Sequence, residues 1–405
     1  MPQYVTQIYI YSTSMNEKTT LRPARADIKS DCIFLLYKHT LIRYSSNEEN
    51  RLTAMKMRET SAPGIADKKT KHIHHNSTMQ EQTPDISVIV PVYNAEATLA
   101  RCLESLTRGQ VQALEIICVN DGSTDSSADI LEQWKQADSR IKVFTQPNAG
   151  VSAARNRGLQ HVRGRYLAFV DADDEVTPDY LSNLLNHALQ YDADLVVCGH
   201  RYVGTAKSTT VSPSFCHMPQ ITPDELSTLP PSVCSHLYAT RAISHSGKVA
   251  QFPLGIRYGE DTAFHYALFP YCRNVVQCEE NGYIIYYTEG SSNSRAASIV
   301  VDMIQATAWL AEQYNLHGMP DDCRKSLLLY AAHTMRRIHS LAAHKAQKKA
   351  AADMRSILAG ENFTEQEAKA LPAKYAQVLV SIISGGTGLN ASYYFKRFKK
   401  WLRRK

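Results

Sequence analysis

Short apolar segments alternate with amphipathic segments between residues 86 and 199. Apolar side chains run almost without interruption, as in ISVIV and LEIICV, through 86–91, 114–119, 141–145, 165–171 and 194–199. Segments with helical spacing lie between them, at 96–108, 124–137, 151–162 and 178–190. Continuous apolar strands are typical of a parallel sheet that helices cover on both faces. We therefore predict an α/β fold with a Rossmann-like order of strands and helices.

The pattern changes after this region. Residues 200–298 are irregular and rich in tyrosine, with strands expected near 275–287. From about residue 300 the periodicity is helical, at 300–315, 322–345, 364–384 and 391–404. The charged stretch 344–358 is expected to be a solvated helical face or a connection. We therefore divide the chain into an α/β domain at 85–298 and a mostly helical region at 299–405.

The first 84 residues show no sustained periodicity. Their one strongly apolar stretch is CIFLLY, and a histidine-rich patch near residue 74 is best explained as part of a solvated tail. Composition of this kind rarely supports a packed core. We predict that residues 1–84 are a disordered or non-native extension, and one hypothesis is that the functional protein begins at Met79.

Positive charge is concentrated at the end of the chain. The formal net charge is +6, but residues 396–405, KRFKKWLRRK, contain seven basic residues and no acidic one. The rest of the chain is close to neutral and gives no sign of a nucleic-acid-binding face. Phe398 and Trp401 recur at helical spacing among the basic residues, which indicates an amphipathic helix on an anionic membrane surface. A packed helix of the bundle or a basic disordered tail is the alternative.

Cysteine usage and hydropathy indicate in which cellular compartment the protein lies. Nine cysteines are scattered without a Cys-x-x-Cys pair, which favours reduced thiols in a cytosolic protein and argues against a zinc site. No stretch of about 18 apolar residues is present, so we predict no transmembrane helix. With the basic tail, this predicts a cytoplasmic protein that lies peripherally on the inner face of the cell membrane.

Polar and acidic residues follow three of the predicted strands. The first strand runs into PVYN at 91–94, the second ends at Asp121, and the fourth ends in DADD at 171–174. Ligands of open α/β sheets bind outside the carboxyl ends of the strands. These residues predict one site, suited to a nucleotide diphosphate held with a divalent metal ion. Because no Gly-x-Gly-x-x-Gly follows the first strand, a dinucleotide-dependent oxidoreductase is disfavoured.

Four motifs in order, VPVYN, VNDGSTD, GVSAARNRG with VDADD close behind, and GED, resemble those of the inverting family-2 glycosyltransferases of the bacterial surface-polysaccharide type. The resemblance covers about residues 86–295. It implies the nucleotide-sugar-binding fold called GT-A, and transfer of a hexosyl or N-acetylhexosaminyl group from a nucleotide-sugar donor, expected to be a UDP-sugar. It also implies a saccharide or lipid-linked saccharide acceptor, and Mn²⁺ or Mg²⁺ as the cofactor.

The resemblance assigns roles to residues at the nucleotide. Asp121 is expected to accept the imide N–H of uracil, and Pro91 and Tyr93 to contact the nucleoside. Arg155, in GVSAARNRG, is expected to approach the nucleotide, with a surface or helix-bridging arginine as the alternative. Glu96 is a secondary candidate, because it is better explained as support for the start of a helix.

Two carboxylates, Asp171 and Asp173, leave the fourth strand two positions apart and can approach one cation. Hard oxygen ligands suit Mg²⁺ or Mn²⁺, and a diphosphate would complete the coordination shell. The resemblance makes Asp173 the direct ligand, and Asp171 the acid that contacts the ribose or bridges to the metal. Asp174 is a secondary candidate, with a solvated loop acid as the alternative.

A second acidic pair, Glu260 and Asp261, follows Gly259. An inverting transfer is a single displacement, so a carboxylate opposite the leaving diphosphate must take the acceptor's proton. The resemblance assigns this catalytic base to Asp261. Glu260 would then hydrogen-bond the acceptor or tune the base through its like charge. Because AFHYALF follows, an acid pair at a helix N-terminus is the alternative.

Two further candidates carry weaker signals. Arg295, in SSNSR, resembles part of a loop that closes over the diphosphate, against an ordinary polar loop. His236 lies in CSHLY, where many relatives have a pattern like Trp-x-Lys-Leu-Tyr. A donor contact by His236 is a secondary hypothesis, and a structural role is favoured.

Two other functions stay open. A sugar nucleotidyltransferase on a related sheet would not need the Glu260–Asp261 pair. A catalytically silent glycan- or membrane-binding scaffold would not need the intact carboxylates of Asp121, Asp173 and Asp261.

Overall fold

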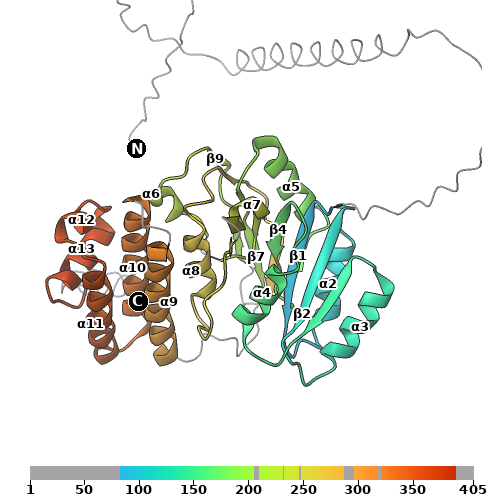
Figure 1. Cartoon of the computed structure of the whole chain (residues 1–405), viewed down its shortest axis with the longest axis horizontal. Coiled ribbons are helices and arrows are strands. Elements are labelled where there is room, and N and C mark those ends of the chain that lie inside the picture. Colours follow the sequence, from blue (N-terminus) through green and yellow to red (C-terminus); the bar gives the residue numbers. More distant parts are fainter. Residues whose placement is uncertain are drawn as a thin grey trace, which may run out of the picture. The chain divides into compact units, whose positions relative to one another are not determined.

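The computed structural model describes residues 83–204, 209–230, 232–245, 248–286, 296–316 and 321–388. These belong to the second of two units into which the chain divides, Met79–Lys405. Within this unit, an α/β part coloured from blue through green to yellow is followed by an orange-to-red group of helices (Figure 1). Residues 1–82 of the extension predicted at 1–84 and the helix predicted at 391–404 lie outside the described residues.

The first half of the α/β part follows the predicted alternation closely. Its elements are β1 (Ile86–Val92), α2 (Leu99–Thr107), β2 (Leu114–Asn120), α3 (Ser127–Ala137), β3 (Ile141–Thr145), α4 (Val151–Leu159) and β4 (Tyr166–Phe169). The strands pair in parallel in the order β3-β2-β1-β4. Every residue of β1 and β2 is buried, which is what continuous apolar strands achieve when both faces of a sheet are covered.

The second half extends this sheet in a way that the sequence did not predict. Its elements are α5 (Tyr180–Tyr191), β6 (Leu195–Val197), β9 (Cys216–Met218), β10 (His236–Ala239) and β13 (Val275–Gln277). Within the described residues the sheet has eight strands, in the order β3-β2-β1-β4-β10-β6-β13-β9. Because β10 is antiparallel to both β4 and β6, the sheet is mixed. The strand predicted at 194–199, β6, therefore runs in the same direction as β4, and the antiparallel strands β10 and β9 are the additions that the sequence did not predict.

A smaller sheet supports the acidic loop after β4. Its strands are β5 (Glu175–Val176), β14 (Tyr283–Tyr286), β7 (His200–Val203) and β8 (Thr209–Val211), paired in the order β5-β14-β7-β8. Because β5 begins directly after Asp174 and pairs with β14, the strand predicted near 275–287 holds the DADD loop in place. Short elements complete this part: α6 (Pro223–Leu226), α7 (Thr240–Ile243), β11 (Ser244–His245), β12 (Lys248–Val249) and α8 (Glu260–Ala267).

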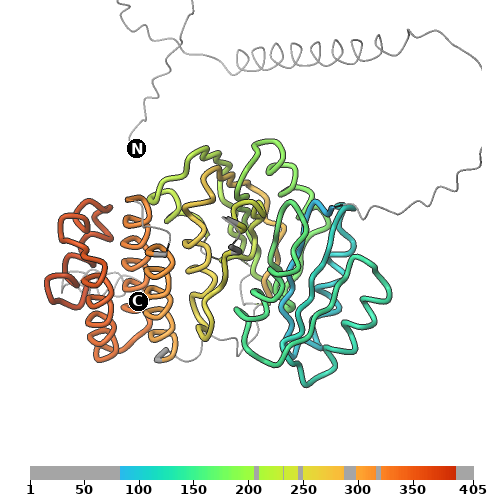
Figure 2. The backbone as a smooth tube through the Cα atoms, viewed as in Figure 1, coloured from blue at the N-terminus to red at the C-terminus, as the bar shows by residue number. Residues whose placement is uncertain are grey.

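The C-terminal part is helical, as predicted (Figure 2). It consists of α9 (Ala296–Leu316), α10 (Asp321–Leu341), α11 (His344–Gly360), α12 (Glu365–Lys369) and α13 (Ala373–Ile383). The single helix predicted at 364–384 is two helices. Proline lacks a backbone N–H and restricts the residue before it, so Pro372 separates α12 from α13.

No described helix is long and apolar enough to cross a membrane.

Helix α8 lies where the two parts meet (Figure 1). The hydroxyl of Tyr314, in α9, donates to the carbonyl oxygen of Tyr266, in α8, at 2.7 Å. Lys325, in α10, pairs with Asp224, in α6, at 2.6 Å. The C-terminal helices therefore contact both α6 and α8, and the first two residues of α8 are the predicted Glu260 and Asp261.

Candidate active site

A cleft of about 760 Å³ opens at the carboxyl ends of β1, β2 and β4. These strands are neighbours in the sheet, so the loops that follow them meet at one edge. The cleft is lined by five of the residues predicted to hold the nucleotide and the metal: Pro91, Tyr93, Asp121, Asp171 and Asp173. The side chains that the sequence placed after three different strands thus share one cavity.

Hydrogen bonds tie the loop after β1 to the loop after β2. Asn94 has φ 49°, a left-handed conformation that asparagine tolerates, and its Oδ1 accepts from the backbone N–H of Thr124 at 2.8 Å. Glu96 Oε2 accepts from the backbone N–H of Ser126, at the start of α3, at 3.0 Å. Glu96 therefore supports the start of a helix in the next crossover, and it does not line the cleft.

Asp121 organises the loop that leads into α4. Its Oδ1 accepts from Gln146 Nε2 at 2.8 Å and from the backbone N–H of Ala149 at 2.9 Å. Its Oδ2 accepts from the backbone N–H of Gly150 at 2.8 Å. A carboxylate offers about four lone-pair positions. Asp121 thus shapes the cleft floor and keeps acceptor capacity for a ligand N–H.

The three acids after β4 have different surroundings. Asp173 is exposed at the cleft, and desolvation together with the charge of Asp171 raises the pKa of its carboxyl. Asp174 turns away from the cleft. It accepts from the hydroxyl of Tyr283 at 2.9 Å and from the backbone N–H of Tyr286 at 3.1 Å. Burial, and then the charges of Asp171 and Asp173, raise the pKa of Asp174 to about 8.

Asp171 and Asp173 together fit a divalent cation. Both line the same cleft with oxygen donors, and desolvation together with the neighbouring charge of Asp171 raises the pKa of Asp173 there. Mg²⁺ sites typically combine one or two carboxylates with phosphate oxygens of a substrate. Asp174 does not fit this donor set, because its two oxygens are engaged by the smaller sheet.

Arg155 connects the acidic loop after β4 to Glu260. It is 4% exposed, and its Nη2 donates to Asp171 Oδ1 at 2.9 Å while its Nη1 donates to Glu260 Oε1 at 3.2 Å. Cys234 Sγ donates to the other oxygen of Asp171 at 3.3 Å. Arg155 also lines a side chamber of about 600 Å³ that shares Asp171 with the cleft. Arg155 is therefore a buried bridge between carboxylates.

The acidic pair forms the first turn of α8. Gly259 precedes it with φ 86°, a conformation that favours glycine. Glu260 lines the side chamber, and burial together with the charge of Asp261 raises its pKa to about 7. Asp261 Oδ1 accepts from the backbone N–H of Thr262 at 2.7 Å, and burial raises the pKa of Asp261 as well. Among the described contacts, Asp261 Oδ2 accepts no hydrogen bond, which leaves it available to take a proton.

Two predicted candidates are not brought to this site. His236 is fully buried in β10, where its Nδ1 lies 2.9 Å from the carbonyl oxygen of Cys234, and burial lowers its pKa to about 4. It lines neither the cleft nor the side chamber, so its place is structural. Arg295 lies outside the described residues.

Arg257 is a candidate that the sequence reasoning missed. Its exposed side chain lines both the cleft and the side chamber, as does Asn148. The available signal was a basic residue shortly before the Gly-Glu-Asp motif, in GIRYGED. An exposed guanidinium at this place can face the charged part of a ligand that occupies both spaces.

Comparison with known proteins agrees with this geometry. Residues 87–242 match the model of the family "Glycosyl transferase family 2". The uncharacterized glycosyltransferase EpsJ of Bacillus subtilis is 31% identical over 260 residues, which are 61% of this chain and 74% of EpsJ. The putative teichuronic acid biosynthesis glycosyltransferase TuaG of the same species is 34% identical over 143 residues, 35% of this chain and 56% of TuaG.

A solved structure shares the fold. Residues 1–349 of S. aureus TarS, crystallised with UDP-GlcNAc, superpose with a TM-score of 0.62 over 75% of this chain and 88% of that chain, at 18% sequence identity. The likeness identifies the α/β part as a GT-A fold. The family match, together with the extent of the match to EpsJ, shows that this chain belongs to glycosyl transferase family 2.

Proposed function

We propose that this protein is an inverting glycosyltransferase that moves a sugar from a UDP-sugar to a hydroxyl of a surface-glycan or lipid-linked acceptor. The observation that carries the proposal is the bridge of Arg155, which joins Glu260, the neighbour of Asp261 at the start of α8, to Asp171 in the cleft. That TarS was crystallised with UDP-GlcNAc supports a uridine nucleotide as the donor.

The donor would occupy the cleft and the side chamber. Asp121, between Pro91 and the loop before α4, would accept the imide N–H of uracil with its remaining lone pair. Arg257 would face the diphosphate, since it lines both spaces. Asp173, with Asp171 behind it, would hold Mn²⁺ or Mg²⁺, and such an ion neutralises negative charge on a diphosphate leaving group.

Asp261 would act as the base. Its Oδ2 would take the proton of the acceptor hydroxyl as the acceptor oxygen bonds to the anomeric carbon. The bond from that carbon to the diphosphate oxygen breaks in the same step, and UDP leaves with the electron pair. Because attack and departure occur on opposite faces, an α-linked donor gives a β-linked product. Glu260, fixed by Arg155, would tune Asp261 through its nearby charge.

The acceptor and the location follow from the relatives and the basic tail. The name of TuaG refers to teichuronic acid biosynthesis, which supports a cell-surface polymer as the acceptor. The seven basic residues of 396–405 would hold the enzyme peripherally on the cytoplasmic face of an anionic membrane.

A donor screen tests the proposal. UDP-sugars and GDP-mannose are incubated with the protein and Mn²⁺, Mg²⁺ or EDTA, and release of the nucleoside diphosphate is measured. We expect hydrolysis of at least one UDP-sugar, loss of activity in EDTA, and little activity in Asp173→Asn. Asp129→Asn, an exposed acid in the first turn of α3, is the matched control and should keep full activity.

Three outcomes would contradict the proposal. A preference for GDP-mannose would argue against the role of Asp121. Full turnover in EDTA would show that the reaction needs no divalent metal ion, against the proposed site at Asp171 and Asp173. Absence of any hydrolysis, with UDP binding intact, would favour the scaffold, whereas formation of a nucleotide-sugar from a sugar phosphate would favour a nucleotidyltransferase.

A further inference from the structure

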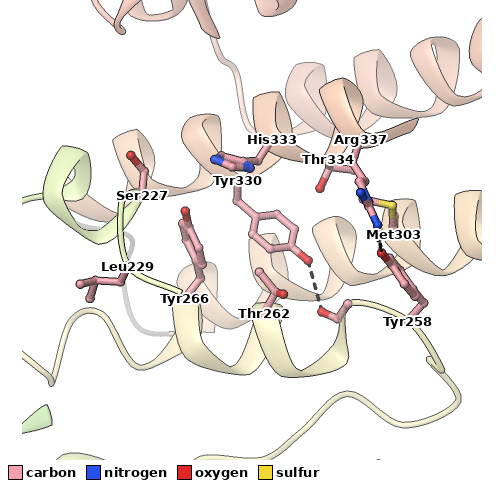
Figure 3. Close-up of a pocket in the computed structure, with 11 residues that line it drawn as sticks. Ser227, Leu229, Tyr258, Thr262, Tyr266, Met303, Tyr330, His333, Thr334 and Arg337 are labelled. Carbon is pink, nitrogen blue, oxygen red and sulfur yellow. Dashed lines mark hydrogen bonds between the residues drawn. The ribbon is translucent and has the colours of Figure 1, made fainter. Parts of the chain in front are cut away.

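A further cavity lies between α8 and the helices α9 and α10, and its lining includes no residue that the sequence predicted for the site (Figure 3). Its volume is about 350 Å³, within the range of about 300–1,000 Å³ of small-molecule sites. Its walls include Tyr258 and Tyr266 from the region of α8, Met303 from α9, and Tyr330 and Arg337 from α10. The C-terminal helices therefore supply about half of the lining, and the GT-A part without them would not form this pocket.

The cavity adjoins the proposed base. Gly259 and Thr262 line it, and they flank Glu260 and Asp261 on either side in the chain. The hydroxyl of Thr262 lies 3.3 Å from Asp261 Oδ1, and the hydroxyl of Tyr330 lies 3.4 Å from the carbonyl oxygen of Gly259 (Figure 3). Thr262 thus both lines the cavity and contacts the Asp261 carboxylate, which does not itself line the cavity.

The lining combines aromatic rings with hydroxyl groups. Three tyrosines and Met303 offer apolar surfaces, and Thr262 and Thr334 offer hydroxyls. The C–H face of a sugar ring packs against aromatic rings, while its hydroxyls need polar partners, and tyrosine supplies both. A saccharide matches this composition better than a purely apolar ligand.

One end of the cavity is positively charged. Arg337 is exposed, and its Nε and Nη2 donate to the hydroxyl of Tyr258 at 3.3 and 3.1 Å (Figure 3). Among the described residues, no carboxylate pairs with Arg337, and none of the lining side chains is acidic. Because its partner is a hydroxyl rather than a carboxylate, the guanidinium keeps further donors for an anion.

We propose that this cavity is the acceptor site, and that the acceptor is a saccharide with a carboxylate or phosphate group that pairs with Arg337. The inference rests on the proposed function, since the hydroxyl that Asp261 would deprotonate has to extend from the bound saccharide past Thr262 to the carboxylate. It also assigns a role to the C-terminal helices: α9 and α10 select the acceptor, while the α/β part binds the donor.

Three probes that differ only at C6 test this proposal: methyl β-glucoside, methyl β-glucuronide and methyl β-glucoside 6-phosphate. Their affinities for the full chain are measured by NMR titration. We expect one or both anionic probes to bind about tenfold more tightly than the neutral one, the expected size of one charge-assisted hydrogen bond. Which anionic probe binds more tightly identifies the charged group.

Variants locate the site. Arg337→Gln should reduce the affinity for the anionic probes to that for the glucoside. Arg336→Gln is the matched control, because Arg336 is one position away in α10 and does not line the cavity. It should keep the tenfold preference. Equal affinities for the three probes in the wild type, or an unchanged preference in Arg337→Gln, would overturn the inference.

UDP binding, measured by calorimetry with Mn²⁺ in the same proteins, separates this inference from the proposed function. If the protein binds UDP but shows no preference for the anionic probes, the proposed acceptor site is wrong and the proposed donor site is unaffected. If the wild type does not bind UDP, the proposed function itself is contradicted, regardless of the affinities measured for the three probes.

Discussion

Arg155 and Glu260 are 105 positions apart in the chain, and a hydrogen bond of 3.2 Å joins Arg155 Nη1 to Glu260 Oε1. The same guanidinium donates to Asp171 at 2.9 Å. Arg155 lies in α4 and Glu260 begins α8, so this contact ties the part of the fold that forms the cleft to the helix that carries the proposed base. The charge of the arginine also offsets repulsion between two carboxylates that burial brings together.

Removing this guanidinium should destabilise the fold. Loss of one partner of a buried charge pair costs about 3–5 kcal/mol. We expect Arg155→Met to lower the free energy of unfolding by an amount near the lower end of that range, because the Asp171 side chain is 33% exposed. Urea unfolding measures it, with Arg157→Met, an exposed neighbour in α4, as the control. Equal losses in the two variants would contradict the bridging role.

Substitutions of the acidic pair should distinguish the proposed base, Asp261, from Glu260, which is proposed to change the pKa of that base. Asp261→Asn keeps the shape of the side chain but cannot take a proton, so transfer should fall by about 10²–10⁴-fold with UDP affinity nearly unchanged. Glu260→Gln should keep more activity and shift the rise of the rate with pH to lower pH, because a nearby negative charge is removed. If UDP affinity fell as steeply as turnover in Asp261→Asn, Asp261 would be a donor-binding residue.

Much of this site was predictable, for a local reason. Continuous apolar strands such as β1 and β2 indicate a buried parallel sheet. The carboxyl ends of its strands lie at one edge, so the polar residues that follow them lie close together. Asp121, Asp171 and Asp173 therefore line one cleft as expected.

The surroundings of the other residues depend on long-range contacts that the sequence pattern does not predict. Asp174 turns away because Tyr283, 109 positions later, meets it from β14. β10 is short and begins with a histidine, so its antiparallel insertion beside β4 had no clear pattern. The cavity at Arg337 depends on how α10 packs on α8, which helical periodicity alone does not specify.

Buried histidines should make the fold sensitive to acid. Burial lowers the pKa of His236 from 6.5 to about 4, and that of His265, whose ring centroid lies 5.1 Å away, also falls. Between these pH values the unfolded chain binds more protons than the folded one, so stability is full above pH 6.5 and decreases as pH falls. For His236 alone this amounts to about 2 kcal/mol between pH 7.5 and pH 5.

The measurement is the free energy of unfolding at these two pH values. His236→Phe should lose less stability on acidification than the wild type. His344→Gln, at an exposed position at the start of α11, should behave like the wild type. An unchanged difference in His236→Phe would show that other groups control the acid response.

The basic tail should hold the enzyme on anionic membranes. Each basic residue near such a surface contributes about 1 kcal/mol, and salt weakens the attraction. Deletion of 391–405 should therefore release the protein from anionic vesicles in a sedimentation assay, while hydrolysis of the UDP-sugar is kept. Vesicle binding that resists both the deletion and high salt would exclude this role of the tail.

The stereochemistry of the reaction tests the central claim most directly, because it needs no knowledge of the acceptor. The protein is incubated with Mn²⁺ and an α-linked UDP-sugar that it hydrolyses, and the anomeric proton of the released sugar is followed by NMR before mutarotation. A single displacement supported by Asp261 predicts the β anomer first, and its slower appearance in Asp261→Asn. Initial release of the α anomer would contradict an inverting transfer at this site.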